Sequence, residues 1–374
     1  MSLEAIRLPD LENAARTMPF DQFGRYHALR EAVDACRNVL CDAPLSILEV
    51  GGYFRTMEGE ETLPIVQFLP RDRVTVLDVI DSTLEGYVQG DGAALTFGDE
   101  EFDLVISSDT FEHIPRPKRE RFWQELLRVA RHGVILAAPF GTPAVEAAEE
   151  ILALYINAEL HEEQQQLKEH REYRLPVIEA WLEHLSRQNI NTRAYPIAYL
   201  HSWLGMMLIK HLLLRLAPGP QAQHLVDSYY NHYFFPTERR LPTYRYLVVA
   251  EKTTGLLAAV DAAIAPTIMP PQPDVSAGWG AALLPAVLAI GQRQLGRQEE
   301  QARQQMQQLQ QTLATLDATL HHARLKAEQD AAAIKDLTER AQWLDAQASS
   351  LRAELRAVSN GLVMRLLQRF RRRG

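Results

Sequence analysis

Cysteine is scarce in this chain. Among its 374 residues only Cys36 and Cys41 are cysteines, and both precede the first expected strand. Two thiols without partners at metal-ligand spacing exclude a disulfide framework and a cysteine-rich zinc site. No apolar run reaches the roughly 18 residues of a membrane-spanning helix, and the N-terminus has no basic segment followed by an apolar one. We therefore expect a cytoplasmic protein with reduced thiols.

A basic excess is also missing. The net charge is −9, from 39 Lys and Arg against 48 Asp and Glu, which excludes bulk attraction to nucleic acid. The apolar content of 47% is enough for one large or two small domains. Composition divides the chain into a globular part at 1–252, a linker rich in proline and alanine at 253–294, a coiled coil at 295–360 and a basic amphipathic tail at 361–374.

The globular part alternates strand-like and helix-like segments, which is typical of an α/β fold with a parallel sheet. Strands are expected at Ser46–Val50, Arg73–Asp78, Tyr87–Gly90, Phe102–Ser107, Gly133–Ala137, Thr192–Ile197 and Tyr244–Ala250. Helices are expected at Leu11–Val39, Pro117–Ala130 and Leu175–Gln188. Two further helical segments, Pro143–Glu172 and His201–Tyr233, exceed a minimal fold of this kind and are candidates to roof a ligand crevice.

Glycines and acids stand where the strands end. The strand Ser46–Val50 runs into Gly51-Gly52, the next ends on Asp78, and Asp91 follows the third within a Gly-Asp-Gly-Ala segment. Glycine lets the backbone pass close to a ligand, and a carboxylate accepts hydrogen bonds from a ribose diol. This arrangement suits a nucleotide-like ligand across the carboxyl edge of the sheet.

The order of these pieces over Ser46–Pro139 resembles class I S-adenosylmethionine methyltransferases, as does Tyr244–Lys252 more weakly. The resemblance implies a seven-stranded Rossmann-like sheet with an antiparallel final strand, and S-adenosylmethionine as cofactor. One departure is the glycine loop, where Tyr53 and Phe54 follow Gly51-Gly52; they are expected to cover the methionine part or to narrow the pocket. The implied cofactor residues are Arg25, Tyr26, Glu49, Gly51, Gly52, Asp78, Val79, Asp91, Gly92, Ala93 and Ser108.

Several of these residues have distinct implied roles. Asp78 binds the ribose, Asp91 meets the adenine amino group, and Ala93 donates its backbone N–H to the adenine. Glu49 holds either the loop or the ammonium of the methionine part, and the helix with Arg25 and Tyr26 closes over the cofactor.

The segment from Asp109 to His113 follows the fourth strand, and in the family this loop faces the sulfonium and the acceptor. His113 is the candidate general base for a sugar hydroxyl, because an unperturbed imidazole titrates near neutrality. Asp109 or Glu112 would orient it or share the task. Alternatively, Glu112 and His113 only anchor the next helix. No metal is expected at this site.

The third part predicts a coiled coil through a sustained seven-residue repeat. Asp330 alone breaks the apolar register, and the helix would extend roughly 85 Å at 1.5 Å per residue. An association of two or three chains is the default. The a positions are Met306, Leu313, Leu320, Ala327, Ile334, Ala341, Ala348, Leu355 and Leu362, and the d positions are Leu309, Leu316, Ala323, Asp330, Leu337, Leu344, Leu351 and Val358.

The tail separates apolar and basic residues onto two faces of one helix, which suits the interface of an anionic membrane. Several copies in an oligomer would bind by avidity. Alternatively, the tail is a solvated helix end whose arginines favour the C-terminal dipole. The apolar face holds Leu362, Val363, Leu366, Leu367 and Phe370, and the basic face Arg365, Arg369, Arg371, Arg372 and Arg373.

A methyltransferase followed by a coiled coil and a basic tail looks like bacterial polysaccharide-assembly enzymes. This likeness implies O-methylation of a sugar in a surface polysaccharide or lipid-linked glycan. It further implies a homo-oligomer with a glycosyltransferase partner, peripheral on the inner face of the plasma membrane. Two alternatives stay open: a catalytically silent scaffold for a glycan-assembly complex, and a small-molecule or lipid methyltransferase whose acceptor site is the apolar stretch His201–Leu216.

Overall fold

The computed structural model describes residues 11–40, 43–56, 59–160, 162–214, 219–270 and 275–371, without the side chains of 158–160, 275–295 and 370. The chain divides into two compact units, Met1–Leu295 and Gly296–Gly374. Cys41, Arg372 and Arg373 lie outside the described residues, whereas Cys36 is buried as a free thiol.

A seven-stranded mixed sheet organises the first unit. Its order is β5-β4-β1-β6-β7-β9-β8. The first five of these strands pair in parallel, whereas β9 runs antiparallel to both β7 and β8. The structure thus confirms the predicted Rossmann-like sheet with its antiparallel last strand. The strands are β1 (Ser46–Val50), β4 (Arg73–Asp78), β5 (Tyr87–Gln89), β6 (Phe102–Ser108), β7 (Ala130–Pro139), β8 (Asn191–Tyr199) and β9 (Thr243–Glu251), with a separate hairpin of β2 (Phe54–Arg55) and β3 (Glu61–Thr62).

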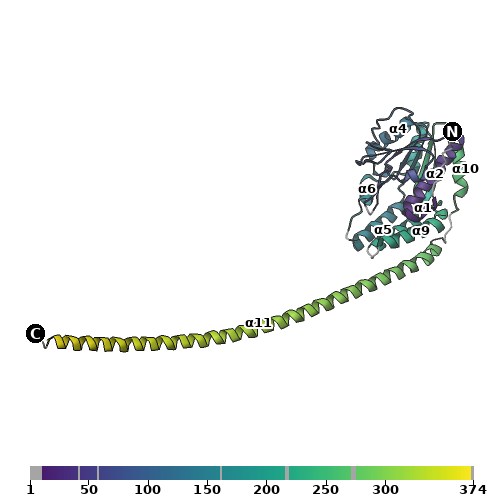
Figure 1. Ribbon diagram of the computed structural model, residues 1–374. Helices are drawn as coiled ribbons and strands as arrows, with labels where there is room; N and C mark the ends of the chain where they lie inside the picture. Colours follow the sequence, from purple (N-terminus) through teal and green to yellow (C-terminus); the bar gives the residue numbers. More distant parts are fainter. Residues whose placement is uncertain are drawn as a thin grey trace, which may run out of the picture. The chain divides into compact units, whose positions relative to one another are not determined.

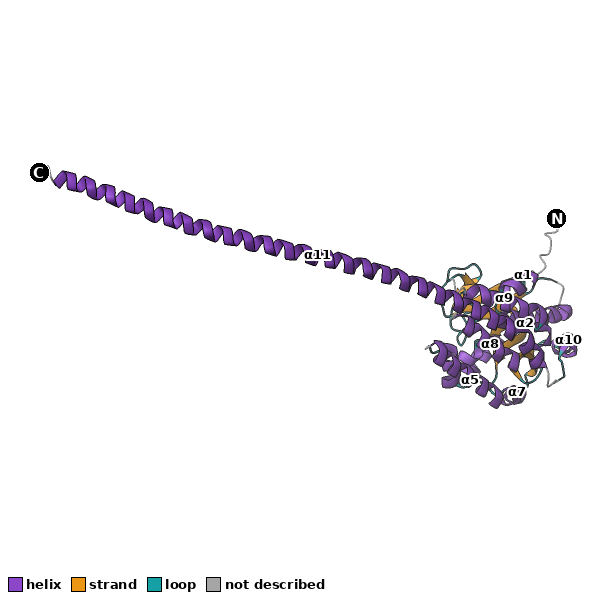
Figure 2. Cartoon of the chain, turned by 90° about the horizontal axis from the view of Figure 1, so that it is seen from below, coloured by secondary structure: helices purple, strands orange, loops and turns teal. Residues whose placement is uncertain are grey.

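Helices cover both faces of this sheet (Figures 1 and 2). Successive side chains of a strand point to opposite faces, so Ile47 packs in the cluster of α2, α3 and α10, whereas Leu48 packs with α4 and α7. A third apolar cluster joins α5, α8 and α9. The helices are α1 (Leu11–Thr17), α2 (Phe20–Leu40), α3 (Ile65–Phe68), α4 (Arg119–Val129), α5 (Pro143–Leu160), α6 (Gln165–Tyr173), α7 (Ile178–Arg187), α8 (Leu200–Leu214), α9 (Gly219–Tyr233), α10 (Leu256–Ile264) and α11 (Val275–Arg371).

Three segments that were each expected to form one helix form two helices in the structure. Pro19 separates α1 from α2, because a proline has no N–H to donate and disfavours helix in the residue before it. The segment Pro143–Glu172 forms α5 and α6, and His201–Tyr233 falls within α8 and α9. The start of α7 at Ile178, after Pro176, shortens the helix expected from Leu175.

The expected linker over 253–294 contains folded structure at both ends. Helix α10 contacts α2 and buries Leu256, Val260 and Ile264 completely, because these residues lie three or four positions apart on one face. Helix α11 begins at Val275 and passes through Pro285, where proline removes one backbone hydrogen bond without ending the helix.

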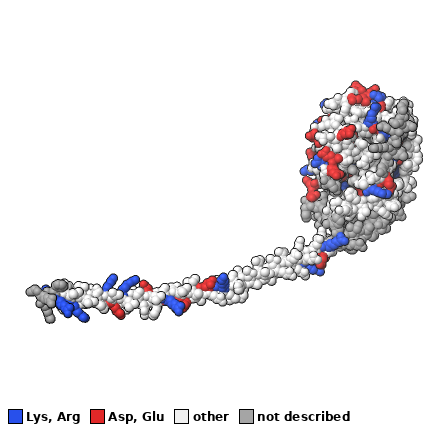
Figure 3. Space-filling model, viewed as in Figure 1, with Lys and Arg blue, Asp and Glu red and all other residues white. Residues whose placement is uncertain are grey.

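The second unit consists of the continuation of α11, drawn from green to yellow in Figure 1. Its heptad positions are exposed in the single chain except for the half-buried Ala348; Leu309, Leu316 and Leu337 are each at least 60% accessible. Lys, Arg, Asp and Glu side chains alternate along the visible face of its C-terminal part (Figure 3). Among the described residues, no helix is long and apolar enough to cross a membrane.

Candidate functional site

Two adjoining cavities open at the carboxyl ends of the parallel strands. The first, here the strand-end cavity, has a volume of about 380 Å³ and is lined by the ends of β1 and β4, by the segments that follow β1, β4, β5 and β6, and by Phe122 of α4. The second, here the covered cavity, has a volume of about 340 Å³ and lies between these strand ends and α2, α6 and α8. Gly51, Tyr53, Asp109 and His113 line both. The site is therefore bipartite, with a shared wall.

The strand-end cavity brings together the acids that end two strands. Asp78, at the end of β4, accepts hydrogen bonds from the N–H groups of Val79 at 2.7 Å and Tyr53 at 3.3 Å. Asp91, Gly92 and the exposed side chain of Val79 line the same cavity. Neighbouring parallel strands end at one edge of the sheet, so residues far apart in sequence meet here.

Ala93 was expected to donate its backbone N–H to the adenine, but it does not line the strand-end cavity. It is buried and is not part of either cavity's lining. Its N–H donates to Asp91 Oδ1 at 2.9 Å, so that donor is satisfied within the protein.

Close approach of the backbone explains two of the glycines. Gly51 has φ of 85°, and a Cβ there would lie 1.8 Å from Thr110 Oγ1. A Cβ on Gly92 would lie 2.5 Å from the Phe122 ring. Any side chain at either position would displace the cavity floor, and Gly51 also needs a left-handed backbone that glycine adopts without strain.

Glu49 lies beneath this loop as a buried carboxylate without a partner. It is fully buried, and neither carboxylate oxygen has a hydrogen-bond partner at normal distance and angle, although the Tyr26 hydroxyl is close enough to oppose the rise of its pKa. A Cβ on Gly52 would lie 2.1 Å from Glu49 Oε2, so only glycine fits above it. Burial raises the pKa of Glu49 to about 8, against the opposing charge of Arg25. A buried carboxylate of this kind is suited to a cationic ligand group.

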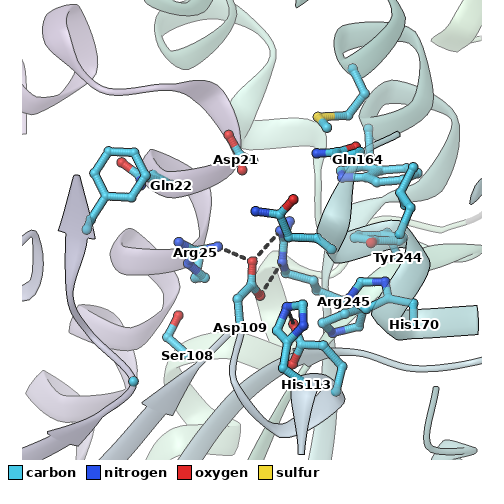
Figure 4. A pocket seen from close by; sticks show the side chains of 18 of the residues that line it. Asp21, Gln22, Arg25, Ser108, Asp109, His113, Gln164, His170, Tyr244 and Arg245 are labelled. Carbon is cyan, nitrogen blue, oxygen red and sulfur yellow. Dashed lines mark hydrogen bonds and ion pairs between the residues drawn. The ribbon is translucent and has the colours of Figure 1, made fainter. Parts of the chain in front are cut away.

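Asp109 is the centre of an ion cluster in the shared wall. Arg245 of β9 donates from Nε and Nη2 at 2.7 and 2.6 Å, and Arg25 of α2 donates from Nη1 (Figure 4). Burial by itself would raise the pKa of Asp109, but the charges of Arg245 and Arg25 hold it at about 2. Asp109 is therefore an anchored anion. The residue also has a left-handed φ of 44°, a strained conformation for a side chain of this type.

Glu112 and His113 occupy the short helical turn Phe111–His113 after β6, and His170 of α6 faces them. His113 Nδ1 bonds Glu169 at 2.7 Å, which leaves Nε2 available toward the cavities. Burial lowers the pKa of His113, and the neighbouring His170 adds to the effect. Burial raises the pKa of Glu112 well above its ordinary value, and the charge of Asp109 contributes. His113 is thus placed as a neutral acceptor of a proton.

The covered cavity also contains residues that sequence reasoning had not assigned to the site. Gln164, His170, Trp203 and Lys210 come from the two segments that exceed the minimal fold, and Arg245 comes from within the last strand. For Arg245 the sequence offered one signal, a charged residue within the expected strand Tyr244–Ala250, because an arginine inside a buried strand needs a partner. The predicted residues Arg25, Tyr26 and Ser108 line this cavity, and Ser108 Oγ is buried without a partner.

The described residues fit the cofactor that the sequence resemblance implies. The unpartnered carboxylate of Glu49 suits an ammonium, Asp78 retains acceptor capacity for a diol, and the close-packed glycines leave room for a ligand above the loop.

Comparisons with known proteins bear on the same region. Residues 66–138 match the family model described as a methyltransferase domain. The matched segment includes Asp78, Asp91, Asp109, Glu112 and His113. A search of curated protein sequences gave no match.

Solved structures resemble the chain at low identity. The YcgJ protein of Bacillus subtilis is 14% identical, with 60% of this chain and 99% of that chain covered and a TM-score of 0.33. The plantazolicin methyltransferase BpumL in complex with SAH is 13% identical, with 65% and 88% covered and a TM-score of 0.38. The magnesium protoporphyrin IX methyltransferase of Synechocystis with bound SAH is 12% identical, with 63% and 89% covered and a TM-score of 0.34.

Proposed function

We propose that the protein is an S-adenosylmethionine-dependent methyltransferase that binds the cofactor in the strand-end cavity and an acceptor in the covered cavity. The observation that carries the proposal is Glu49, a fully buried carboxylate with no partner, directly beneath a glycine loop. Such a group costs stability unless a cation meets it. The cofactor's ammonium is such a cation, and Asp78 lies at the same edge for its ribose.

The described residues would divide the work as follows. Glu49, which lies beneath the loop and outside the lining of both cavities, attracts the ammonium from below, Asp78 accepts hydrogen bonds from the ribose hydroxyls, and Asp91 meets the adenine. When bound, S-adenosylmethionine supplies an activated methyl group, which the acceptor takes by in-line displacement. The ion cluster of Arg25, Asp109 and Arg245 keeps the wall between cofactor and acceptor fixed.

The lining of the covered cavity favours a polyhydroxylated acceptor, and we propose a sugar hydroxyl of a bacterial surface polysaccharide or lipid-linked glycan. Gln164, Gln166, Asp21 and Lys210 offer several hydrogen-bonding groups to hydroxyls. Trp203, stacked on Tyr244 at 3.5 Å between ring centroids, gives the apolar surface that a sugar ring needs. His113 Nε2 would accept the hydroxyl proton.

The structure of α8 is less compatible with an apolar, lipid-like acceptor. Met206, Ile209 and Leu213 of α8 are buried in the third apolar cluster, so they pack within the protein instead of facing a ligand. This burial favours the glycan over the lipid acceptor that the apolar stretch first suggested.

Binding of S-adenosylhomocysteine measured by calorimetry tests the cofactor proposal. We expect one site per chain, with Asp78→Ala weakening binding at least tenfold and the exposed Asp81→Ala as matched control leaving it unchanged. Absence of binding by the folded wild type would refute the enzyme assignment. Transfer of labelled methyl from S-adenosylmethionine to glycan or lipid extracts then identifies the acceptor class; cofactor binding without transfer to either would favour a silent scaffold.

We further propose that the chain self-associates through α11. The heptad residues are exposed in the single chain, and a stripe of this length is stabilised by covering it with the same stripe of another copy. Mass photometry of the full chain should give two or three copies. Leu316→Glu with Leu337→Glu should give monomers, whereas Gln310→Glu with Lys335→Glu, off the stripe, should not.

The tail is proposed to bind an anionic membrane once copies are joined. Leu362, Leu366 and Leu367 are each more than half exposed, and Arg365 and Arg369 lie on the same helix. Deleting 361–374 should abolish co-sedimentation with vesicles containing phosphatidylglycerol; persistence of binding would show that the tail is not the anchor. A glycosyltransferase partner stays part of the proposal and would be sought by co-purification with the intact chain.

A further inference from the structure

Three side chains that could each offer a ligand atom to a metal ion converge at the edge of the covered cavity. They are Glu112 and His113 on the turn after β6, and His170 on α6. One ligand atom of each lies within 4.8 Å of the others. The two imidazole rings lie side by side, with centroids 4.9 Å apart (Figure 4).

The outer nitrogen of each imidazole is held by a carboxylate. His113 Nδ1 bonds Glu169 Oε2 at 2.7 Å, and His170 Nδ1 bonds Glu149 Oε1 at 2.7 Å. The hydroxyl of Tyr244 donates to the same Glu149 oxygen at 2.8 Å and fixes it in place. A carboxylate that accepts the Nδ1 proton leaves Nε2 as a lone-pair donor, which is the arrangement of metal-binding histidines.

Two of the inward atoms are buried and unsatisfied. His170 is 5% exposed and Glu112 is 1% exposed, and neither His170 Nε2 nor Glu112 Oε2 has a hydrogen-bond partner. Each such atom lowers the stability of the protein unless a partner meets it. Two of them on residues of one cluster indicate a ligand that the cluster can hold.

The charge around the cluster is also unbalanced. Glu112, Glu149 and Glu169 surround two imidazoles, and among the residues that the structure describes no Lys or Arg forms an ion pair with these three carboxylates. Arg119 bonds the backbone carbonyl of Glu112 at 3.1 Å and not its carboxylate, and Arg25 and Arg245 are engaged by Asp109. A divalent cation would supply the missing positive charge.

We propose that Glu112, His113 and His170 bind one divalent transition-metal cation of the Zn²⁺ or Co²⁺ class. Two imidazoles and a carboxylate are a donor set that such ions prefer. Tetrahedral ligands at about 2.1 Å from an ion lie about 3.4 Å apart, so binding draws these atoms together by roughly an ångström. No metal was expected from the sequence, because His170 belongs to an insert whose position only the fold defines.

The remaining coordination position faces the covered cavity, where the proposed function puts the acceptor. The cation would hold an acceptor hydroxyl and lower its pKa, in place of proton removal by His113. This role depends on the proposed function, whereas metal binding itself does not. The two can therefore fail separately.

The test is a titration of the untagged, chelator-treated full chain with CoCl₂, followed by visible absorption and then by displacement with ZnCl₂. We expect one Co²⁺ per chain, with d–d bands that disappear when one equivalent of Zn²⁺ is added. His170→Ala should weaken binding at least tenfold, whereas His184→Ala, whose ring bonds Glu120 at the surface, should leave it unchanged.

A second variant protects the test against misfolding. Glu149→Gln keeps the shape of the side chain but weakens the support of His170, and should lower Co²⁺ affinity by about 10–100-fold while retaining wild-type S-adenosylhomocysteine binding. The proposal would be overturned if the wild type binds no stoichiometric Co²⁺. It would also be overturned if His170→Ala and Glu149→Gln both bind Co²⁺ as tightly as the wild type does. Metal binding without cofactor binding would leave the site in place and refute only the methyltransferase assignment.

Discussion

Replacement of Glu49 by glutamine should make the protein more stable and a poorer binder of its cofactor. The isosteric change removes an ionisable group that must take up a proton to be buried, at a position in which neither carboxylate oxygen has a partner. The expected changes in stability and in cofactor binding have opposite signs. Substitution of a residue with a purely structural role would not produce both. Substitution of a residue that only packs or only folds the loop would lower stability and binding together.

The magnitude follows from the pKa of Glu49, which burial raises from 4.5 to about 8. A raised pKa means that the native state binds a proton more tightly than the unfolded chain, so this contribution to stability is present below pH 4.5 and is lost as the pH rises through 8. At pH 7 the loss amounts to about 3 kcal/mol, at 1.36 kcal/mol for each pH unit above 4.5. The buried amide of Glu49→Gln retains part of the desolvation cost, so a net gain of about 1–3 kcal/mol is expected.

The assay is urea unfolding of both proteins at several pH values between 5 and 9. The difference in unfolding free energy should be small near pH 5 and should grow as the pH rises through 8, and the exposed control Glu150→Gln should show no such trend. Calorimetry should show binding of S-adenosylhomocysteine weakened by about 10–100-fold, the loss of one buried charge-assisted contact. A variant that is less stable than the wild type at pH 8 would show that Glu49 has a structural partner and refute the reasoning.

Two further predictions concern buried charges. Asp109→Asn leaves Arg25 and Arg245 facing one another in the interior and should lower the unfolding free energy by about 3–5 kcal/mol in urea unfolding; a loss no greater than that of the exposed control Glu183→Gln would contradict the ion-cluster assignment. Asp227→Asn should raise stability by up to about 4 kcal/mol at pH 7, because burial raises the pKa of Asp227 from 3.8 to about 7 and its stabilising contribution is lost as the pH rises through that range. An advantage that does not shrink toward pH 4 would show that a different property of Asn is responsible.

The site residues that the sequence predicted are those that lie in, or directly after, a single strand. Asp78 and Asp91 each follow a recognisable strand, and the parallel sheet then brings them to one edge without any further information. Glu49, Gly51 and Gly52 could be predicted for the same reason, because they lie in β1 or directly after it. The strand bounds were predicted to within a few residues for the same reason, since apolar and β-branched runs carry their own signal.

The rest depends on contacts between elements. His170 reaches His113 only because the insert folds as two helices, with α6 lying against the turn after β6. Arg245 reaches Asp109 only because β9 lies next to β7 in the sheet. The Arg25 side chain meets the same carboxylate from α2, where sequence had predicted contact with the cofactor. No local pattern states which of many arginines or histidines will make such a contact.

The methyltransferase match over 66–138 includes none of the helices that cover the acceptor side, because α2 precedes it and α6 and α8 follow it. The strand-end cavity is lined entirely by residues from 50–122, whereas Gln164, His170, Trp203 and Lys210 of the covered cavity lie beyond 138. Cofactor binding and acceptor choice would thus be encoded largely in separate stretches of sequence, joined at Gly51, Tyr53, Asp109 and His113, which line both cavities. Changes in α6 and α8 can then alter the acceptor while the cofactor site stays intact. The matched segment therefore bears on the strand-end cavity more than on the acceptor side, and the recipient has to be identified by experiment.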